Sequence, residues 1–437
     1  MVKDLKATRR GFMGLAAAGA ALAATNARAA APKTVDTKAK VLILGAGAAG
    51  TALANRLSER LIGAEITIVD PRKEHWYQPG FSLIAAGLKP EKYVVSGTGA
   101  WLPGSVKWVA DRAAEVDPVS KKVRTEGGEV LPFDYLIVAT GLSLNYGAIE
   151  GFEMDMIGRD GIGSLYASPD AAAKTWQSAG RFVDEGGVGI FTRPATEMKC
   201  AGAPIKHTFL IDDLARKNGT SNLDIHYTAH SGALFGVPIV AEKLRMLFSQ
   251  REITPHYKHV LKRVDAGRKV ATFDTENGEA EMKYDYLHVV PPQQAPEVIR
   301  SNSELTNPEK WGGRGWMTVD KYTLRHDRFP NIFAVGDVAG VPKGKTAASV
   351  KWQVPVVEEH LVAQIAGDTT DARYNGYTSC PLITRVGRAM LIEFDYNNDL
   401  TPSFPGIIAP LEELWITWLM KEVALKATYN AMLRGEA

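Results

Sequence analysis

The chain contains two cysteines in 437 residues, and both lie in segments that could carry redox chemistry. Cys200 lies in residues 196–204 (TEMKCAGAP), and Cys380 lies in residues 374–381 (YNGYTSCP). Two cysteines cannot form a disulfide framework, but they can form one redox pair that a sulfur nucleophile opens by thiol–disulfide exchange. The alternative is two unrelated buried thiols, since free cysteine is among the most buried residue types. Residues elsewhere in the chain must decide between these interpretations.

The composition is that of a soluble globular protein long enough for about two or three domains. Hydrophobic residues make up 45% of the chain, charged residues make up 23%, and the formal net charge is +2. Basic residues in the first 29 positions supply that positive excess. The remainder is close to neutral, so bulk charge gives no case for binding nucleic acid.

Residues 1–30 have the pattern of an export signal. The twin arginine at positions 9 and 10 precedes a short apolar run rich in alanine and glycine, and residues 27–29 (ARA) offer a cleavage site. The apolar run is too short to span a membrane. We therefore predict export by the twin-arginine route, with the mature protein in the periplasm and peripheral on the membrane.

Residues 40–70 carry the full sequence context of a dinucleotide-binding fingerprint. An apolar strand at residues 40–44 is followed by a glycine-rich turn, a helical segment and a second strand that ends in Asp70. The turn residues that we expect at the cofactor are Gly45, Gly47, Ala49 and Gly50. Glycines let the backbone approach a pyrophosphate at a helix N-terminus, and the terminal acid accepts hydrogen bonds from the adenosine ribose. The alternative is a glycine-rich turn without a ligand.

Two later strand ends indicate which dinucleotide binds. Residues 135–141 (YLIVATG) end in Thr140 and Gly141, and residues 331–337 (NIFAVGD) end in Gly336 and Asp337. In this order they resemble the flavoproteins with two dinucleotide-binding domains. In that family the Thr-Gly turn packs near FAD, and the aspartate bonds its ribityl and pyrophosphate region. FAD is therefore the expected cofactor.

The second nucleotide site that such flavoproteins carry is altered here. The strand at residues 187–192 runs into Arg193 and Pro194, where an NAD(P)H site would need glycines. The next strand, residues 224–227, shows no acid at its end for a ribose. We expect a second Rossmann-like domain without a nicotinamide fingerprint, so the reductant is not NAD(P)H.

The segments around both cysteines resemble one family in particular. Residues 199–206 (KCAGAPIK) and 376–382 (GYTSCPL) are similar to the two cysteine segments of the sulfide:quinone oxidoreductases, in the form typical of the type II, mitochondrial branch. Further stretches match that branch in order, at residues 75–79, 288–292, 345–348, 392–396, 419–421 and 432–435. The resemblance covers about residues 40–436, although an export signal is not a feature of the mitochondrial members.

The resemblance implies an α/β fold with two Rossmann-like domains and a C-terminal amphipathic helical region. The expected boundaries are the export signal at 1–30, the first part of the FAD-binding domain at 38–150, the second Rossmann-like domain at 151–300, the second part of the FAD-binding domain at 301–370, and the redox-cysteine, quinone and membrane-contact region at 371–437.

The family's chemistry is the oxidation of sulfide to persulfide or polysulfide through a cysteine pair and non-covalent FAD, with two electrons passed to a membrane quinone. Carried over to this chain, sulfide attacks Cys380, and Cys200 departs as the thiolate that faces the flavin. Lys199 and Lys206 flank Cys200 and would lower its pKa. A small thiol or sulfite is the candidate acceptor of the sulfur.

The resemblance also suggests binding residues. The FAD contacts expected beyond the glycine turn and the two strand ends are Gln78, Ala113, Lys345, Thr346, Ala347 and Ala348. Residues 345–348 should open a helix whose N-terminus stabilises negative charge on the flavin. The expected quinone or substrate residues are Lys206, Phe394, Phe404, Ile407 and Lys421. The histidines show no metal-ligand spacing, and we expect no metal.

The last segment of the chain predicts an amphipathic helix. From residue 410 onward, apolar residues that include Trp415 and Trp418 recur at near-helical spacing, with charged residues between them. Such a helix lies on a membrane surface rather than spanning it, and a lipid-borne quinone would be reached from there. A helix packed on the protein body or on a partner is the alternative.

Two other functions stay open at this point. One is the flavoprotein subunit of a flavocytochrome c-type sulfide dehydrogenase, which shares fold and export and passes electrons to cytochrome c. That family attaches FAD through a cysteine after the second strand, and residues 74–83 contain none, which favours non-covalent FAD and the quinone interpretation. The other is a sulfur-carrier flavoprotein without turnover.

Overall fold

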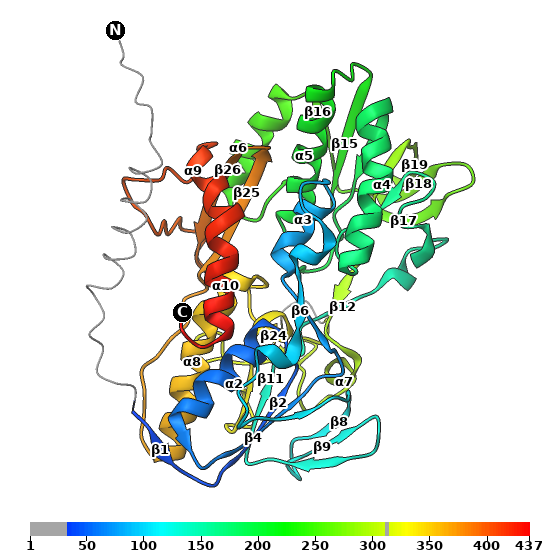
Figure 1. The fold of residues 1–437 in the computed structure, drawn as a ribbon. Helices are drawn as coiled ribbons and strands as arrows, with labels where there is room; N and C mark the ends of the chain where they lie inside the picture. Colours follow the sequence, from blue (N-terminus) through cyan, green and yellow to red (C-terminus); the bar gives the residue numbers. More distant parts are fainter. Residues whose placement is uncertain (1–32, 311–313) are drawn as a thin grey trace.

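The computed structural model describes residues 33–310 and 314–437. The export signal predicted for residues 1–30 lies outside the described residues. Two five-stranded parallel sheets organise the molecule, one at the lower and one at the upper end of Figure 1, and the C-terminal helices run along one side. The fold is therefore α/β with a helical C-terminal region, as the sequence predicts.

The first sheet carries the glycine-rich turn. Its strand order is β23-β11-β2-β4-β7, and all neighbours are parallel. The strands are β2 (Lys40–Leu44), β4 (Glu65–Val69), β7 (Lys107–Val109), β11 (Tyr135–Val138) and β23 (Ile332–Ala334). Central parallel strands are covered on both faces, which is why β2 and β11 are nearly continuous apolar runs. Both predicted strand ends, after β11 and β23, lie at the same carboxyl edge of the sheet as the end of β2.

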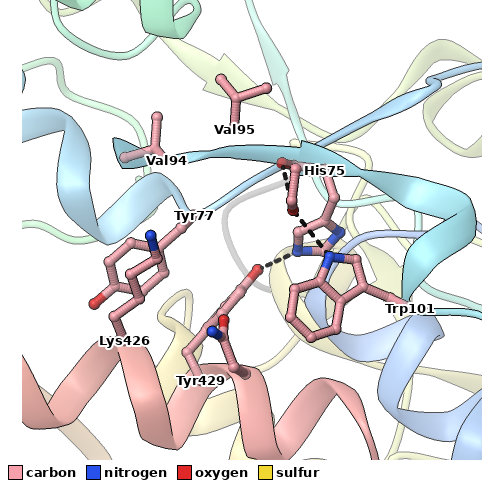
Figure 2. Close-up of a pocket in the computed structure, with 9 residues that line it drawn as sticks. His75, Tyr77, Val94, Val95, Trp101, Lys426 and Tyr429 are labelled. Carbon is pink, nitrogen blue, oxygen red and sulfur yellow. Dashed lines mark hydrogen bonds between the residues drawn. The ribbon is translucent and has the colours of Figure 1, made fainter. Parts of the chain in front are cut away.

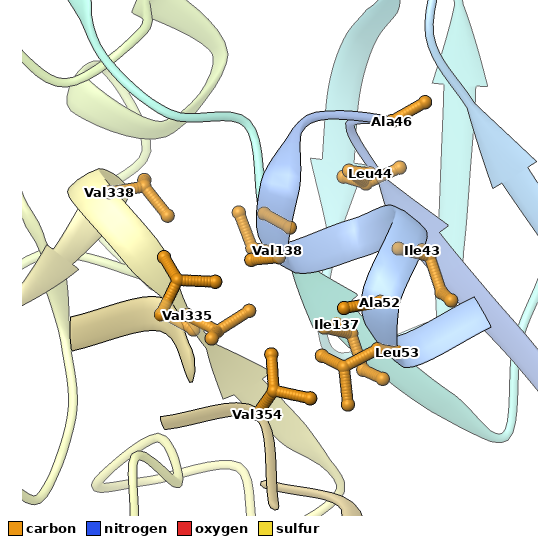
Figure 3. Packing of buried hydrophobic residues seen from close by; sticks show 14 of the residues in the cluster. Ile43, Leu44, Ala46, Ala52, Leu53, Ile137, Val138, Val335, Val338 and Val354 are labelled. Atoms are coloured by element: carbon orange, nitrogen blue, oxygen red, sulfur yellow. The ribbon is translucent and has the colours of Figure 1, made fainter. Parts of the chain in front are cut away.

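Two long helices pack against this sheet. They are α2 (Ala48–Arg60), which starts directly after the glycine turn, and α8 (Ala347–Ala366). Figure 3 shows Leu53 of α2 and Val354 of α8 packed beside Ile137 of β11, and all three side chains are buried. This core fixes the start of each helix relative to the ends of the strands.

The second sheet has the order β13-β20-β14-β15-β16 and is also parallel. Its strands are β13 (Ile162–Gly163), β20 (Tyr286–His288), β14 (Gly187–Phe191), β15 (Leu223–Ala229) and β16 (Ile253–Tyr257), and the helices between them are α4 (Pro169–Glu185), α5 (Ala203–Asn218) and α6 (Pro238–Gln250). The strands predicted at residues 187–192 and 224–227 are confirmed as β14 and β15.

Smaller antiparallel units complete the fold. They are β8-β9-β10 (Ala113–Asp117, Lys122–Thr125, Val130–Pro132), β17-β18-β19 (Val260–Asp265, Val270–Thr275, Gly278–Lys283), β5-β6 (Glu74–Trp76, Val95–Gly97), β12-β21 (Ser143–Leu144, Gln293–Gln294) and the hairpin β25-β26 (Thr378–Arg385, Arg388–Phe394). Short elements are β1 (Val35–Asp36), β3 (Leu61–Ile62), α3 (Phe81–Ile84), α7 (Glu297–Arg300), β22 (Met317–Thr318) and β24 (Ala339–Gly340). The hairpin β25-β26 matters most for function, because β25 carries Cys380.

The C-terminal helical region consists of α9 (Trp415–Leu419), one π-helical turn (Met420–Ala424) and α10 (Leu425–Leu433). Its buried side chains are Thr417, Trp418, Lys421, Tyr429, Met432 and Leu433, so much of its apolar face packs on the body. Among the described residues, no helix combines the length and the apolarity that crossing a membrane requires. A π-helical turn is rare and often marks a functional position, and here it contains Lys421.

Candidate active site

The glycine turn after β2 forms a cradle that side chains would fill. Gly45 has φ +101°, and a Cβ there would lie 2.4 Å from the carbonyl oxygen of Ala139. A Cβ on Gly50 would lie 1.9 Å from the carbonyl oxygen of Gly45, so these two glycines are required by the fold itself. A Cβ on Gly47 would meet only the Arg72 guanidinium, at 3.9 Å, which leaves space beside the N-terminus of α2 for a pyrophosphate.

Asp70, at the end of β4, closes the other side of this cradle. It is buried, and its carboxylate accepts hydrogen bonds from the backbone N–H of Ala46 at 2.7 Å and of Arg72 at 2.8 Å. The hydroxyl of Thr140 is buried without a hydrogen-bond partner, at the predicted Thr-Gly turn. An acid beside the glycine turn and an unpaired hydroxyl at the second strand end fit a dinucleotide of the FAD type.

The segment after β23 brings a lysine and a helix N-terminus to the same edge. Thr346 caps α8 by accepting a hydrogen bond from the backbone N–H of Ser349, so the predicted helix start at residues 345–348 is confirmed. The ammonium of Lys345 turns back and donates to the carbonyl oxygen of Asp337 at 2.5 Å. Burial lowers the pKa of Lys345 to about 8 and raises the pKa of Asp337. The remaining predicted FAD residues, Gln78 and Ala113, lie in the turn after β5 and at the start of β8, where their role stays a prediction.

The fold brings the two cysteines together. Cys200 lies in the loop three residues before α5 begins, and Cys380 lies on β25, which packs against α5. A Cβ on Gly202 would lie 2.5 Å from the sulfur of Cys380, so that sulfur touches the backbone of the Cys200 loop. Both cysteines are free thiols in the structure and share a hydrogen bond. The interpretation as two unrelated thiols therefore fails on geometry.

Cys200 is held in an unusual backbone conformation. Its φ is +76°, in the left-handed region that costs a residue with a side chain about 1 kcal/mol or more. Its carbonyl accepts hydrogen bonds from the Ala203 N–H at 2.7 Å and from the Tyr166 hydroxyl at 3.3 Å. The neighbouring N–H of Lys199 donates to the buried amide of Gln293 at 2.9 Å. These bonds fix the direction of the Cys200 sulfur.

The electrostatics divide the roles of the two sulfurs. The hydrogen bond from Cys380, and after it the ammonium of Lys206, hold the pKa of Cys200 well below its usual range although the group is buried. The same hydrogen bond and burial raise the pKa of Cys380. The ammonium of Lys206 lies 3.6 Å from the Cys200 sulfur. Burial opposes its charge, but the two cysteine sulfurs together outweigh burial and raise the pKa of Lys206 to about 12. Cys200 is thus the thiolate and Cys380 the thiol.

A second buried lysine approaches from the C-terminal region. Lys421, on the π-helical turn, donates to the carbonyl oxygen of Pro79 at 2.8 Å and is almost fully buried. Burial, and then the charge of Lys206, lower the pKa of Lys421 to about 7. Lys199, predicted to assist Cys200, lies over the Tyr166 ring at 5.8 Å, and burial lowers its pKa to about 8. Lys206, rather than Lys199, is the lysine in contact with the thiolate.

The predicted quinone and substrate residues differ in burial. Lys206 and Lys421 are buried beside the cysteine pair. Phe394 is only 8% exposed and packs edge-on against Phe235, in the same buried cluster as Cys380. Phe404 and Ile407 lie in the loop after β26, where Ile407 is 80% exposed. Phe394 is therefore a core residue, and the other two lie on the surface.

Sequence reasoning missed the link between the nucleotide turn and the C-terminal helix. His75 Nδ1 donates to the carbonyl of Ala46 at 3.3 Å, and its Nε2 accepts from the hydroxyl of Tyr429 on α10 at 2.7 Å (Figure 2). Burial lowers the pKa of His75 to about 4, so the ring is neutral. A cavity of about 180 Å³ lies here, and its walls include Tyr77 and Trp101. Only the close match of residues 75–79 to the family hinted at this role.

Comparisons with known proteins show which proteins the whole chain is similar to. Residues 39–182 match the family described as pyridine nucleotide-disulphide oxidoreductase. The mitochondrial sulfide:quinone oxidoreductase of Mus musculus is 35% identical over 407 residues, which are 92% of this chain and 88% of that protein. That of Dictyostelium discoideum is 33% identical over 398 residues, 91% and 86% of the two chains. The sulfide:quinone oxidoreductase structure from Aquifex aeolicus superposes with a TM-score of 0.74 at 20% identity, covering 91% of this chain and 92% of that chain, which supports the fold.

These relatives correct the predicted location. The named relatives in mouse and Dictyostelium are mitochondrial, so the comparisons point to a mitochondrial location, and the prediction of twin-arginine export to the periplasm is wrong. The physical reason is that basic leaders poor in acidic residues are common to bacterial export signals and mitochondrial transit peptides, so this pattern alone does not separate the two.

Taken with the cysteine pair and the nucleotide cradle, matches over nine-tenths of the chain show that it belongs to the sulfide:quinone oxidoreductase family, FAD-dependent enzymes that oxidise sulfide with a quinone as electron acceptor.

Proposed function

We propose that Cys200 and Cys380 are the redox pair of this oxidoreductase and that the sulfur leaves as a persulfide. The observation that carries the proposal is the contact of two cysteines from distant segments, with one lysine ammonium 3.6 Å from one of the sulfurs. A pair in which one sulfur is a stabilised thiolate has a defined leaving group. The opposite pKa shifts of the two thiols therefore assign their roles.

In the oxidised enzyme the two sulfurs form a disulfide. Hydrosulfide attacks the sulfur of Cys380, a new S–S bond forms there, and the Cys200–Cys380 bond breaks. Cys200 leaves as a thiolate with the electron pair of that bond, and Lys206 holds this charge in place. The thiol with the lower pKa leaves faster, which favours this order over attack on Cys200. An acceptor thiol or sulfite, or a further hydrosulfide, then takes the outer sulfur from Cys380.

FAD, when bound, supplies the two-electron carrier between the cysteine pair and the quinone. The residues proposed to hold it are Gly45, Gly47, Ala49, Gly50, Asp70, Gln78, Ala113, Thr140, Gly141, Gly336, Asp337, Lys345, Thr346, Ala347 and Ala348. The turn at residues 45–50 would hold the pyrophosphate, and Asp70 would accept hydrogen bonds from the ribose. The Lys345 ammonium holds the end of the Gly-Asp segment at the start of α8, so positive charge and helix N–H groups lie together there.

Lys421 is proposed to handle a proton at this site. Its pKa of about 7 lets its Nζ give up and regain a proton near neutral pH, and its position beside Pro79 connects the cysteine pair to the C-terminal region. Quinone reduction consumes two protons, so a lysine poised in this way is a suitable local donor.

The experiment is anaerobic titration of the flavin spectrum with sulfide, followed by a short-chain quinone. We expect the wild-type protein to bleach on sulfide and to regain its yellow colour on addition of quinone. An acceptor-free product assay should then find sulfane sulfur. A protein that binds FAD but does not bleach with sulfide would end the proposal.

We also propose that the enzyme contacts the membrane through an apolar C-terminal surface, defined by Phe404, Ile407, Trp415, Ile416 and Val423. These side chains are exposed although they are large and apolar, and Val423 is 62% exposed. All five fall between residues 404 and 423, and large exposed apolar side chains that form a patch favour an interaction site. Because much of α10 is buried, truncation would unfold the body, and point changes are the better test.

The membrane test is liposome flotation of the Ile407→Glu/Val423→Glu double variant against wild type. We expect the double variant to lose flotation, since each change places a charge where apolar contact was proposed. The control is Ile62→Glu, at an exposed apolar position on β3, which should float as wild type does. Equal flotation of all three proteins would reject this surface.

A further inference from the structure

The ammonium of Lys345 lies on the face of a buried tryptophan. Its Nζ is 3.6 Å from the centroid of the Trp316 ring, and the two residues are only 6% and 4% exposed. An ammonium is attracted to the face of an indole ring, and the attraction is strongest where water is excluded. Trp316 belongs neither to the cysteine pair nor to the glycine cradle described above, so its contact with this lysine needs an explanation of its own.

Backbone pairing brings Trp316 to this place. Trp316 directly precedes β22, and Met317 of β22 pairs with Ala339 of β24, just after the Gly-Asp segment. The Lys345 ammonium donates to two carbonyl oxygens of the same segment, that of Asp337 at 2.5 Å and that of Ala339 at 3.2 Å. Two carbonyl oxygens and one aromatic face therefore fix the position of the ammonium.

A carboxylate from the loop of Cys200 holds the tryptophan. Glu197 accepts a hydrogen bond from the indole N–H of Trp316 at 3.0 Å and another from Nε of Arg314 at 3.0 Å. Arg314 also donates to the carbonyl oxygen of Ala195 at 3.2 Å, which ties it to the same loop. Glu197 lies three residues before Cys200, so one loop positions the sulfur and, through Trp316, the ammonium.

The charged groups that act on Lys345 come from these same segments. Burial lowers the pKa of Lys345 to about 8, and the carboxylates of Asp337 and Glu197 oppose burial by favouring the ammonium. Burial raises the pKa of Asp337, whereas Lys345 and Lys199 lower it. The face of Trp316 also favours the charged form of the lysine. Removing the ring or the Glu197 carboxylate would therefore let Lys345 lose its proton at a lower pH.

We propose that Trp316 and Glu197 are positioning residues that keep Lys345 in its charged form beside the flavin. The proposal rests on the placement of FAD at Lys345 in the proposed function. A fixed positive charge favours the reduced form of a flavin, because reduction adds negative charge at that place. Trp316 and Glu197 would thus raise the reduction potential of the flavin and favour its uptake of electrons from the cysteine pair.

The test measures the midpoint potential of the bound flavin against reference dyes at pH 6, 7 and 8, a readout that does not depend on turnover. We expect Trp316→Leu to match the wild-type protein at pH 6 and to have a lower potential at pH 7 and 8. The reason is that without the ring Lys345 should lose its proton about one pH unit lower. Glu197→Ala should act in the same direction, and Trp316→Phe, which keeps a ring face, should lie between Trp316→Leu and the wild-type protein. The control is Glu129→Ala, which removes an exposed carboxylate paired with Lys107 and should match the wild-type protein at every pH.

A second comparison shows whether the effect passes through the lysine. Lys345→Met should have a lower potential than the wild-type protein already at pH 6, because the charge is gone at every pH. Adding Trp316→Leu to Lys345→Met should change the potential no further. If Trp316→Leu does not fold, Trp316→Phe and Glu197→Ala serve in the same comparison, since the Glu197 side chain is 38% exposed.

Two results would overturn the assignment. One is a wild-type potential at all three pH values in Trp316→Leu and Glu197→Ala. The other is an equal shift with and without Lys345, which would mean that the two residues only support the packing. An unchanged potential in Lys345→Met would instead reject the placement of FAD at this lysine, so failure of the inference and failure of the proposed function are distinguishable.

Discussion

The ammonium of Lys206 lies 3.6 Å from the sulfur of Cys200, one turn into the helix that this cysteine precedes. Both groups are on a single segment, whereas Cys380 arrives from β25, far along the chain. The helix therefore brings a positive charge to the sulfur that we propose leaves, and the hairpin brings the sulfur that we propose is attacked.

Replacing Lys206 should shift the pH dependence of sulfide oxidation. Lys206 lowers the pKa of Cys200, so Lys206→Met should raise that pKa and move the pH at which the thiolate forms upward by about one unit or more. The rate of anaerobic flavin bleaching by sulfide, measured across pH, reports the shift. Lys217→Met, on the exposed end of the same helix, is the control and should keep the wild-type profile. An unshifted profile in Lys206→Met would show that the lysine does not act on Cys200.

Gly202 should be essential for the approach of the two sulfurs. A Cβ at this position would lie 2.5 Å from the Cys380 sulfur, closer than real contacts allow, so Gly202→Ala must push the hairpin away from Cys200. We expect a yellow protein with bound FAD and strongly reduced bleaching by sulfide. Gly232→Ala, where the added Cβ would meet nothing within 4 Å, should behave as wild type. Full activity of Gly202→Ala would mean that the sulfurs do not need this contact.

Alanine substitutions at two glycines of the nucleotide turn should affect different properties of the protein. Gly50→Ala places a Cβ 1.9 Å from a backbone oxygen and should destabilise the protein itself. Gly47→Ala meets only a flexible guanidinium at 3.9 Å, so the apoprotein should melt as wild type does while FAD binds more weakly. Thermal melting of the apoproteins and titration with FAD distinguish the two. A Gly47→Ala protein that retains wild-type affinity for FAD would argue against pyrophosphate binding at this turn.

The buried histidines should make the fold sensitive to acid. Burial lowers the pKa of His75 to about 4 and that of His207 to about 3, so both are neutral in the fold. A histidine whose folded pKa is depressed contributes its full stability above its unfolded pKa of about 6.5 and loses it as pH falls toward the folded value. Each histidine should lower the free energy of unfolding by up to about 2 kcal/mol when the pH falls from 7 to 5, because a shift of one pKa unit corresponds to about 1.4 kcal/mol.

Chemical denaturation of the protein at pH 7, 6 and 5 measures this effect. In His207→Gln the free energy of unfolding should fall less steeply as the pH is lowered, because glutamine does not take up a proton. This holds even if the variant is less stable at pH 7. Unchanged stability over this range would contradict neutral burial of these rings.

The parts of this protein that follow from local sequence were predictable. The strand, glycine turn and helix at residues 40–60 depend on neighbours in the chain, as does the cap of α8 at Thr346, and each formed as expected. The pairing of Cys200 with Cys380 came from resemblance and not from spacing. No local signal could supply the approach of Lys421, whose hydrogen bond to Pro79 spans 342 positions.

Other features could not be predicted from the sequence because they arise where distant segments pack together. The left-handed backbone of Cys200 and the packing of Gly202 against a sulfur arise because α5 and β25 converge, which the segment at 196–204 alone cannot reveal. Phe394, which the resemblance suggests as a quinone residue, is turned toward the second core by strand alternation, a burial that its segment alone does not reveal. The amphipathic pattern after residue 410 was correct as a helix, but much of its apolar face packs on the body.

The most direct test of the cysteine mechanism is anaerobic sulfide titration of Cys200→Ser and Cys380→Ser beside the wild-type protein, monitored by the flavin absorbance. Both variants should bind FAD and remain yellow in excess sulfide, while the wild-type protein bleaches and recovers on addition of quinone. Full bleaching of either variant at the wild-type rate would contradict a redox pair made of Cys200 and Cys380.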